Sequence, residues 1–131
     1  MQISDDHINS ISLAAIGNEA LYLLQSGDFR ALAGRFGYAL AFGREIDAAI
    51  SEDLAFCLTE LEAGALLVPG AATLVPEVRY FGPDDFFVAV IGCLAPTDKG
   101  TQVLVELIVT SKGVEKHVTL EQLSVAFEDL G

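Results

Sequence analysis

The sequence predicts an α+β protein in which three N-terminal helices pack on a C-terminal antiparallel meander of about four strands. Its 131 residues fit one domain, which we expect to span residues 1–131. The first half, about residues 5–63, has apolar residues three and four positions apart, as amphipathic helices do. The second half, about residues 65–131, has short β-rich segments between polar turns, which is typical of a meander.

The first predicted helix covers about residues 5–26. Ser4 is a suitable N-cap residue, and Gly27 follows the helical pattern directly, where helix-ending glycines are common. We expect one apolar stripe of this helix to face the core, formed by Ile8, Ile11, Ala15, Ile16, Ala20, Leu23 and Leu24.

Two further helices are predicted. Asp28 can cap a second helix that runs to about Tyr38 and is weakened by its glycines. A third helix covers about residues 45–63 and ends at Gly64. Its inward positions are Ile46, Ala49, Ile50, Leu54, Cys57, Leu58 and Leu61. Its outer positions are acidic and are expected to be solvated: Asp47, Glu52, Asp53, Glu60 and Glu62.

The sheet is predicted from segments with strand chemistry at residues 77–81, 86–94, 101–110 and 114–120. Asp84 and Asp85 fit the first turn between strands, because aspartate side chains accept backbone hydrogen bonds there. Residues 65–75 predict either a buried connection or a short strand interrupted by a turn. Residues 120–131 predict either a last helix or a last strand.

The strands are apolar on both faces. In residues 101–110, one face holds Val103, Val105, Leu107 and Val109, and the opposite face holds Leu104 and Ile108. Residues 86–94 alternate in the same way, with Phe86, Val88 and Val90 on one side and Phe87, Ala89, Ile91 and Cys93 on the other. The helices can cover only one face, so we expect a second copy to cover the other in a homodimer.

The charge balance restricts the partners. Seven Lys and Arg stand against nineteen Asp and Glu, which gives a formal net charge of -12. Such a chain repels nucleic acid, so we expect none to bind. The acidity suits a basic protein partner or the solubility of a chain that is 52% hydrophobic. No apolar window could span a membrane, and the acidic N-terminal segment is unlike a signal peptide, so we expect a cytoplasmic protein.

Glu106 is the main candidate site residue, because it is a carboxylate within an apolar strand. If residues 111–113 form a three-residue hairpin loop, Thr110 faces Val114, and Lys116 lies diagonal to Glu106, where the two can form an ion pair. A loop one residue shorter turns His117 toward Glu106 instead, as a general acid/base couple would require. We favour the structural ion pair over a catalytic acid.

Arg79 and Tyr80 are further candidates, because they lie close to a predicted turn and could line the mouth of a pocket between helices and sheet. Neither His7 nor His117 has metal-ligand spacing, and Cys57 and Cys93 form no zinc motif. Phosphate-binding loops and nucleophile motifs are also absent from the sequence. We therefore expect no metal, no cofactor and two buried free thiols.

The segment ALYLLQSGDFRAL, residues 20–32, places Gly27 and Asp28 between two predicted helices. This opening, followed by a meander, resembles the NTF2-like superfamily of cystatin-like α+β proteins. The resemblance implies a curved sheet around a conical pocket. Chains of that superfamily usually have strands between the second and third helices, whereas Gly43 here leads directly into the third helix. Helices before a meander also resemble small uncharacterised bacterial proteins and immunity-type proteins, which act by binding partners.

Two functions are consistent with these observations. The first is a small acidic binding protein without catalytic activity, homodimeric through its sheet. The second is an NTF2-like pocket protein or enzyme that binds a small apolar ligand, with Glu106 and His117 as acid/base candidates. We prefer the first, because no catalytic motif accompanies the second.

Overall fold

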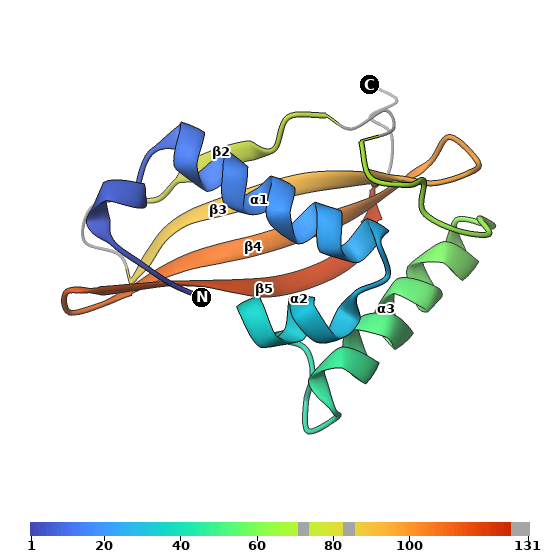
Figure 1. Cartoon of the computed structure of the whole chain (residues 1–131), viewed down its shortest axis with the longest axis horizontal. Coiled ribbons are helices and arrows are strands. Elements are labelled where there is room, and N and C mark those ends of the chain that lie inside the picture. The colour runs from blue at the N-terminus through green and yellow to red at the C-terminus, as the bar shows by residue number, and fades with distance from the viewer. Residues whose placement is uncertain (71–73, 83–85, 127–131) are drawn as a thin grey trace.

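The computed structural model confirms an α+β fold of three α-helices followed by an antiparallel sheet (Figure 1). It describes residues 1–70, 74–82 and 86–126. The helices are α1 (Ser10–Gln25), α2 (Phe29–Phe36) and α3 (Ile46–Glu60), and a short 3-10 turn, η1 (Asp5–His7), precedes them. The strands are β1 (Gln2–Ile3), β2 (Glu77–Tyr80), β3 (Phe87–Pro96), β4 (Gln102–Lys112) and β5 (Glu115–Ala126).

The sheet has five strands in the order β1-β5-β4-β3-β2, and every neighbouring pair is antiparallel. Strands β2 to β5 form the expected meander. The additional strand β1 comes from the N-terminus and pairs with β5. The backbone N–H of Val118 donates to the carbonyl oxygen of Met1 at 2.7 Å, and the Met1 ammonium donates to the carbonyl of Val118 at 2.9 Å.

Side chains at the helix starts explain where α1 and α2 begin. The prediction that Ser4 caps the first helix was wrong, because residues 5–7 form η1 and Asn9 caps α1 by accepting from the Ser12 N–H at 2.8 Å. The predicted cap of α2 is confirmed, since Asp28 accepts from the Ala31 N–H at 3.1 Å. Gly27 has a φ of 73°, a left-handed conformation that suits glycine between two helices.

All three helices lie on one face of the sheet, and α1 runs across its middle (Figure 1). The predicted stripe of α1 was partly wrong: Ile11 and Ala15 are exposed, while Leu13, Gly17 and Leu21 are buried with Ile16, Ala20 and Leu24. From the sheet, the core receives Ala89, Ile91, Cys93, Val103, Val105, Leu107, Val109, Val118, Leu120 and Leu123. The predicted inner face of residues 101–110 is therefore confirmed.

The hairpin between β4 and β5 has a two-residue loop, because Lys112 pairs with Glu115. Gly113, with a φ of 65°, occupies the first loop position, where a type II′ turn favours glycine. Thr110 therefore pairs with His117 and not with Val114, and the three-residue loop was wrong.

A β-bulge lies farther along the same two strands. Glu106 pairs with Gln122 and Leu107 pairs with Leu120, so Glu121 is the extra residue of β5. Because of this bulge, Leu120 and Leu123 both point into the core, while the two residues between them lie on the other face.

A second bulge, between Phe87 and Ala89, explains a wrong prediction about faces. Phe87 pairs with Thr110 and Ala89 pairs with Val109, so Val88 is the extra residue of β3. Ala89 points into the core as expected, but Phe87 lies with Val90 in a hollow on the opposite face.

The two ambiguous segments are resolved in the part of the chain that the structure describes. Residues 119–126 are strand and not helix, as part of β5, whereas residues 127–131 lie outside the described residues. Residues 65–70 and 74–76 form no strand, and only Leu66 makes an isolated bridge, to Thr97. The expectation of a buried connection was wrong for Val68 and Val75, because none of the helices or strands of the described residues covers their exposed side chains.

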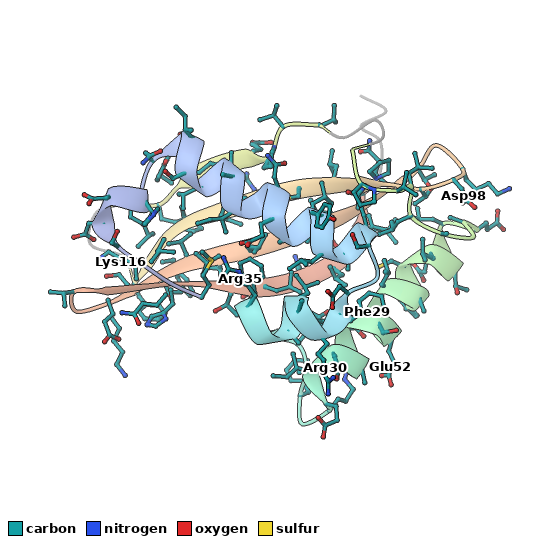
Figure 2. The ribbon with its side chains drawn as sticks, viewed as in Figure 1. Phe29, Arg30, Arg35, Glu52, Asp98 and Lys116 are labelled. Atoms are coloured by element: carbon teal, nitrogen blue, oxygen red, sulfur yellow. The ribbon has the colours of Figure 1, made fainter. Side chains whose placement is uncertain are left out.

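The acidic outer face of α3 is also less uniform than expected. Asp53 accepts a hydrogen bond from the Tyr38 hydroxyl at 2.6 Å and from Arg44 Nη1 at 3.0 Å. Arg44 additionally donates to Glu52 at 3.2 Å, and Glu52 is the labelled residue of α3 in Figure 2. Asp53 is thus not simply solvated: it joins α3 to the loop after α2.

Candidate binding face of the sheet

The face of the sheet opposite the helices is the candidate functional surface. Within residues 1–70, 74–82 and 86–126, no helix covers it. Alternation along the strands places Val90, Leu94, Leu104 and Ile108 here, and each is only partly buried. This confirms that β3 and β4 are apolar on both sides. Toward β5 the same face becomes polar, with Thr119, Glu121, Gln122 and Ser124.

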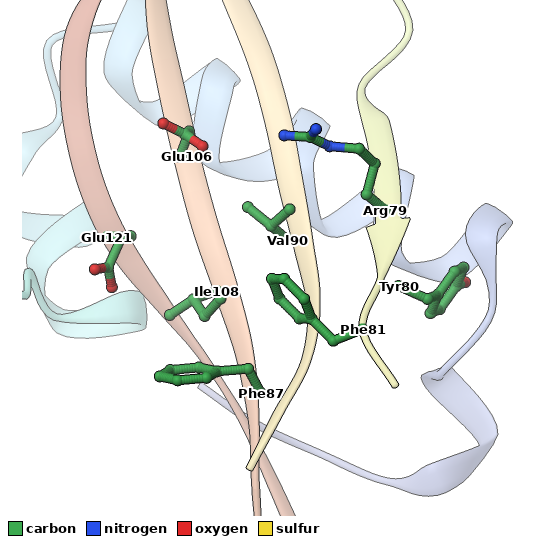
Figure 3. Close-up of a pocket in the computed structure, with 8 residues that line it drawn as sticks. All are labelled: Arg79, Tyr80, Phe81, Phe87, Val90, Glu106, Ile108 and Glu121. Carbon is green, nitrogen blue, oxygen red and sulfur yellow. The ribbon is translucent and has the colours of Figure 1, made fainter. Parts of the chain in front are cut away.

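A hollow of about 550 Å³ crosses this face from β2 to β5 (Figure 3). Its floor includes Val90 of β3 and Ile108 of β4, and Phe81 and Phe87 stand at one end, with ring centroids 6.2 Å apart. Arg79, Tyr80, Glu106 and Glu121 complete its lining. The hollow is open to solvent along the uncovered face and is not the enclosed pocket that the NTF2-like resemblance implies.

A second hollow, of about 410 Å³, adjoins the first and shares Arg79, Val90 and Glu106 with it. It extends to the outer edge of the sheet, where Leu74, Val75 and Glu77 line it. The two hollows together form a trough over β2, β3 and β4.

Glu106 lies in this trough, but both predicted partners of its carboxylate were wrong. The amide nitrogen of Gln122 donates to Glu106 Oε1, because the two residues are paired across β4 and β5. Lys116 instead forms an ion pair with Asp5, 3.3 Å away, at the end of the sheet beside η1 (Figure 2). His117 is opposite Thr110, and its Nε2 is 3.4 Å from Glu115 Oε2.

Arg79 and Tyr80 both border the first hollow but point in different directions. The guanidinium of Arg79 extends over the face of the sheet toward Val90 (Figure 3), with its Nε 3.9 Å from Glu77 Oε1. The ring of Tyr80 points away from the other lining residues, and its hydroxyl lies 3.3 Å from Ser10 Oγ at the start of α1. Of the predicted site residues, the structure therefore brings only Glu106 and Arg79 together on this face.

The face combines an apolar floor with a charged rim. Glu106 and His117 do not meet, so the predicted acid/base couple is absent. Three carboxylates, those of Glu77, Glu106 and Glu121, surround the trough with one guanidinium, Arg79. The apolar floor can contact the apolar part of an amphipathic partner or ligand, and the charged rim can contact its polar part.

No pattern in the sequence directly indicates that Glu121 and Gln122 lie on this face. Strand chemistry predicts the fourth strand only to about residue 120, and alternation alone cannot reveal a bulge that sets two consecutive residues on one face. If the fourth strand is extended to include Leu123 and Val125, as in β5, it contains Glu121 and Gln122.

The two cysteine thiols and the Asp53 carboxyl lie outside the trough. Burial raises the pKa of the Cys93 thiol to about 12 and also raises the pKa of Cys57, so both remain neutral thiols in the core. The hydrogen bond from Arg44 lowers the pKa of Asp53. Among the described residues, no group of three or more His, Cys, Asp or Glu side chains could hold a metal ion.

Comparisons with models of protein families, with curated proteins and with solved structures found no match to this chain. In the described part of the chain, none of the helices has the length and apolar character needed to cross a membrane.

Proposed function

We propose that this chain is a small acidic binding protein without catalytic activity and that it is homodimeric through its sheet. The observation that carries the proposal is the incompletely covered sheet: the helices pack on one face, and the apolar trough over β2, β3 and β4 is open on the other. Monomeric proteins rarely leave a broad apolar face without a partner.

The surroundings of the trough favour binding over catalysis. Glu106 is held by the amide of Gln122, and His117 lies at the far end of β5 beside Glu115. Glu106 and His117 therefore do not form the acid/base couple that would support proton-transfer catalysis in this hollow.

A small apolar ligand is a second candidate occupant, since the volume of about 550 Å³ falls in the range of ligand pockets, roughly 300–1,000 Å³. In this alternative the NTF2-like resemblance would extend to ligand binding, but without the Glu106 and His117 couple. A basic protein is a further candidate partner, because the net charge of -12 would attract it.

Light scattering coupled to size-exclusion chromatography tests the homodimer. At micromolar concentration the native protein should have twice the mass of one chain, and a single-chain mass would overturn this part of the proposal. The binding face is tested with Ile108→Lys, which places a positive charge on the apolar floor of the hollow, and with Thr59→Lys on the exposed side of α3 as the matched control. A basic protein retained at low salt by the native protein and the control should be lost with Ile108→Lys, because the added charge repels it.

A further inference from the structure

Strand β2 is an open edge of the sheet. The Phe81 N–H donates to the carbonyl of Val88 at 2.9 Å, and Glu77 to Tyr80 pair with Gly92 to Ala89 in β3. Along an antiparallel strand, the backbone N–H and C=O groups of alternate residues point to the same side. Those of Glu77 and Arg79 therefore point toward β3, as the N–H of Phe81 does. Val78 and Tyr80 therefore direct their backbone N–H and C=O groups outward, where no neighbouring strand exists in the described sheet.

The other edge of the sheet, formed by β5, is covered along residues 116–120. Strand β1 pairs with β5 at Lys116 and His117, and the Ala39 N–H donates to the carbonyl of Leu120 at 2.9 Å. These contacts occupy backbone groups of β5 that could otherwise bind another strand. The edge at β2 has no comparable cover among the described residues, so the two edges differ in their capacity to pair.

Exposed apolar side chains gather around β2. The exposed fractions are 54% for Leu74, 85% for Val75, 48% for Tyr80 and 45% for Phe81. Ile11, 86% exposed, follows Ser10, whose hydroxyl oxygen lies 3.3 Å from that of Tyr80. The open edge thus combines unpaired backbone groups with apolar surface, which are the two components of strand addition.

We propose that two copies of the chain pair antiparallel through β2, about a two-fold axis at Val78. This inference rests on the proposed homodimer but places its contact at the edge of the sheet and not over the trough, which stays open to the basic protein or small ligand named above as candidate occupants. Outward-facing residues must meet each other for backbone hydrogen bonds to form, which restricts the register to steps of two residues. With Val78 opposite Val78 of the second copy, Glu77 lies opposite Arg79, and Val75 lies opposite Phe81.

Charge selects this register over its neighbours. If the second copy is shifted along β2 by one step of two residues in one direction, Arg79 lies opposite Arg79 of that copy. The same shift in the other direction places Glu77 opposite Glu77. Like charges directly opposite each other are destabilising, whereas opposite charges in such cross-strand pairs stabilise the sheet. In the Val78 register, the Glu77 and Arg79 pair is formed twice, and both positions lie at non-hydrogen-bonded sites, where side chains approach most closely.

Face-to-face association is less favourable. The trough has three carboxylates and one guanidinium, so two troughs in contact would bring together an excess of negative charge in partly desolvated surroundings. Edge pairing avoids this contact. It also leaves the trough accessible and joins the two sheets into one continuous surface, with Glu77 and Arg79 of both copies at its centre.

Cysteine cross-linking tests the register. In the proposed pair, the Cα atoms of residues 77 and 79 of opposite copies are about 4.5 Å apart, within the range that a disulfide spans. An equimolar mixture of Glu77→Cys and Arg79→Cys proteins should cross-link under mild oxidation at least about tenfold faster than either variant alone, since residues facing themselves across the axis are farther apart. Equal rates in all three samples would overturn the register.

Charge reversal provides a second test. Glu77→Arg and Arg79→Glu should each raise the dimer dissociation constant about tenfold or more, and the double variant should return it to near the native value. Glu60→Arg, the same change on the exposed side of α3, is the control, and it should be close to the native protein at an ionic strength of about 0.15 M, where the overall repulsion between the copies is screened. If the native protein is a dimer but neither variant weakens it, edge pairing is wrong and the proposed function stands. A monomeric native protein would overturn both.

Discussion

Gly17 is the residue at which α1 approaches the sheet most closely. A Cβ atom there would lie 2.8 Å from Ile91 Cγ2 and 2.9 Å from Cys93 Sγ, both in the core. Gly17→Ala should therefore lower the free energy of unfolding by about 1–3 kcal/mol, although alanine is the better helix former. Gly34→Ala in α2 is the matched control: nothing lies within 4 Å of its Cβ, so it should stabilise by about 0.5–1 kcal/mol. Urea denaturation of both variants measures the difference, and equal effects would contradict the close packing.

Asp53 links stability to pH through its hydrogen bonds with Arg44 and Tyr38. The bond from Arg44 lowers the pKa of the folded-state carboxyl, so its stabilisation is present above the unfolded pKa of about 4 and decreases as the pH falls through the lower folded pKa. We expect Asp53→Asn to reduce the free energy of unfolding by about 1 kcal/mol at neutral pH. The difference from the native protein should shrink in strong acid. Glu60→Gln, on the exposed side of the same helix, should show neither effect.

At the scale of an element, the start of α1 depends on one cap. Asn9 accepts from the Ser12 N–H at 2.8 Å, whereas Ser4, which the sequence favoured, makes no cap hydrogen bond and instead contacts His7 in η1. Asn9→Ala should lower the free energy of unfolding by about 1 kcal/mol. Ser4→Ala should change it by less than about 0.5 kcal/mol, as is usual for surface substitutions. Thermal unfolding of the two variants distinguishes the caps, and a larger loss at Ser4 would contradict this assignment.

The elements show which parts of the fold follow from sequence. The cap at Asp28 and the glycine after α1, Gly27, could be predicted from the sequence, because each depends only on residues that are close together in the chain. Strand β1 could not be predicted, since two residues have no period of their own and their partners in β5, His117 and Lys116, lie near the other end of the chain. The register at Glu106 depended on the loop length at Gly113 and on a bulge, so the site residues could be named from sequence but their partners could not.

At the scale of the whole molecule, net charge and local charge pairs act in opposite directions on self-association. Each chain has a formal net charge of -12, so two copies repel each other at long range, while the pairs of Glu77 with Arg79 attract only at the edge. Exposed ion pairs contribute about 0.2–1 kcal/mol each, so we expect the overall repulsion to dominate at low salt.

The dimer should therefore become tighter as salt is added. Raising the ionic strength from about 0.01 M to about 0.15 M shortens the Debye length from about 30 Å to about 8 Å, which screens the repulsion between whole molecules and leaves the backbone hydrogen bonds and apolar contacts of β2 in place. Binding of a basic protein to the acidic surface should respond in the opposite way and weaken over the same range. Sedimentation equilibrium of the native protein measures the first response. A dimer that weakens steadily with salt would mean that attraction between charges, and not the paired edge, holds the copies together.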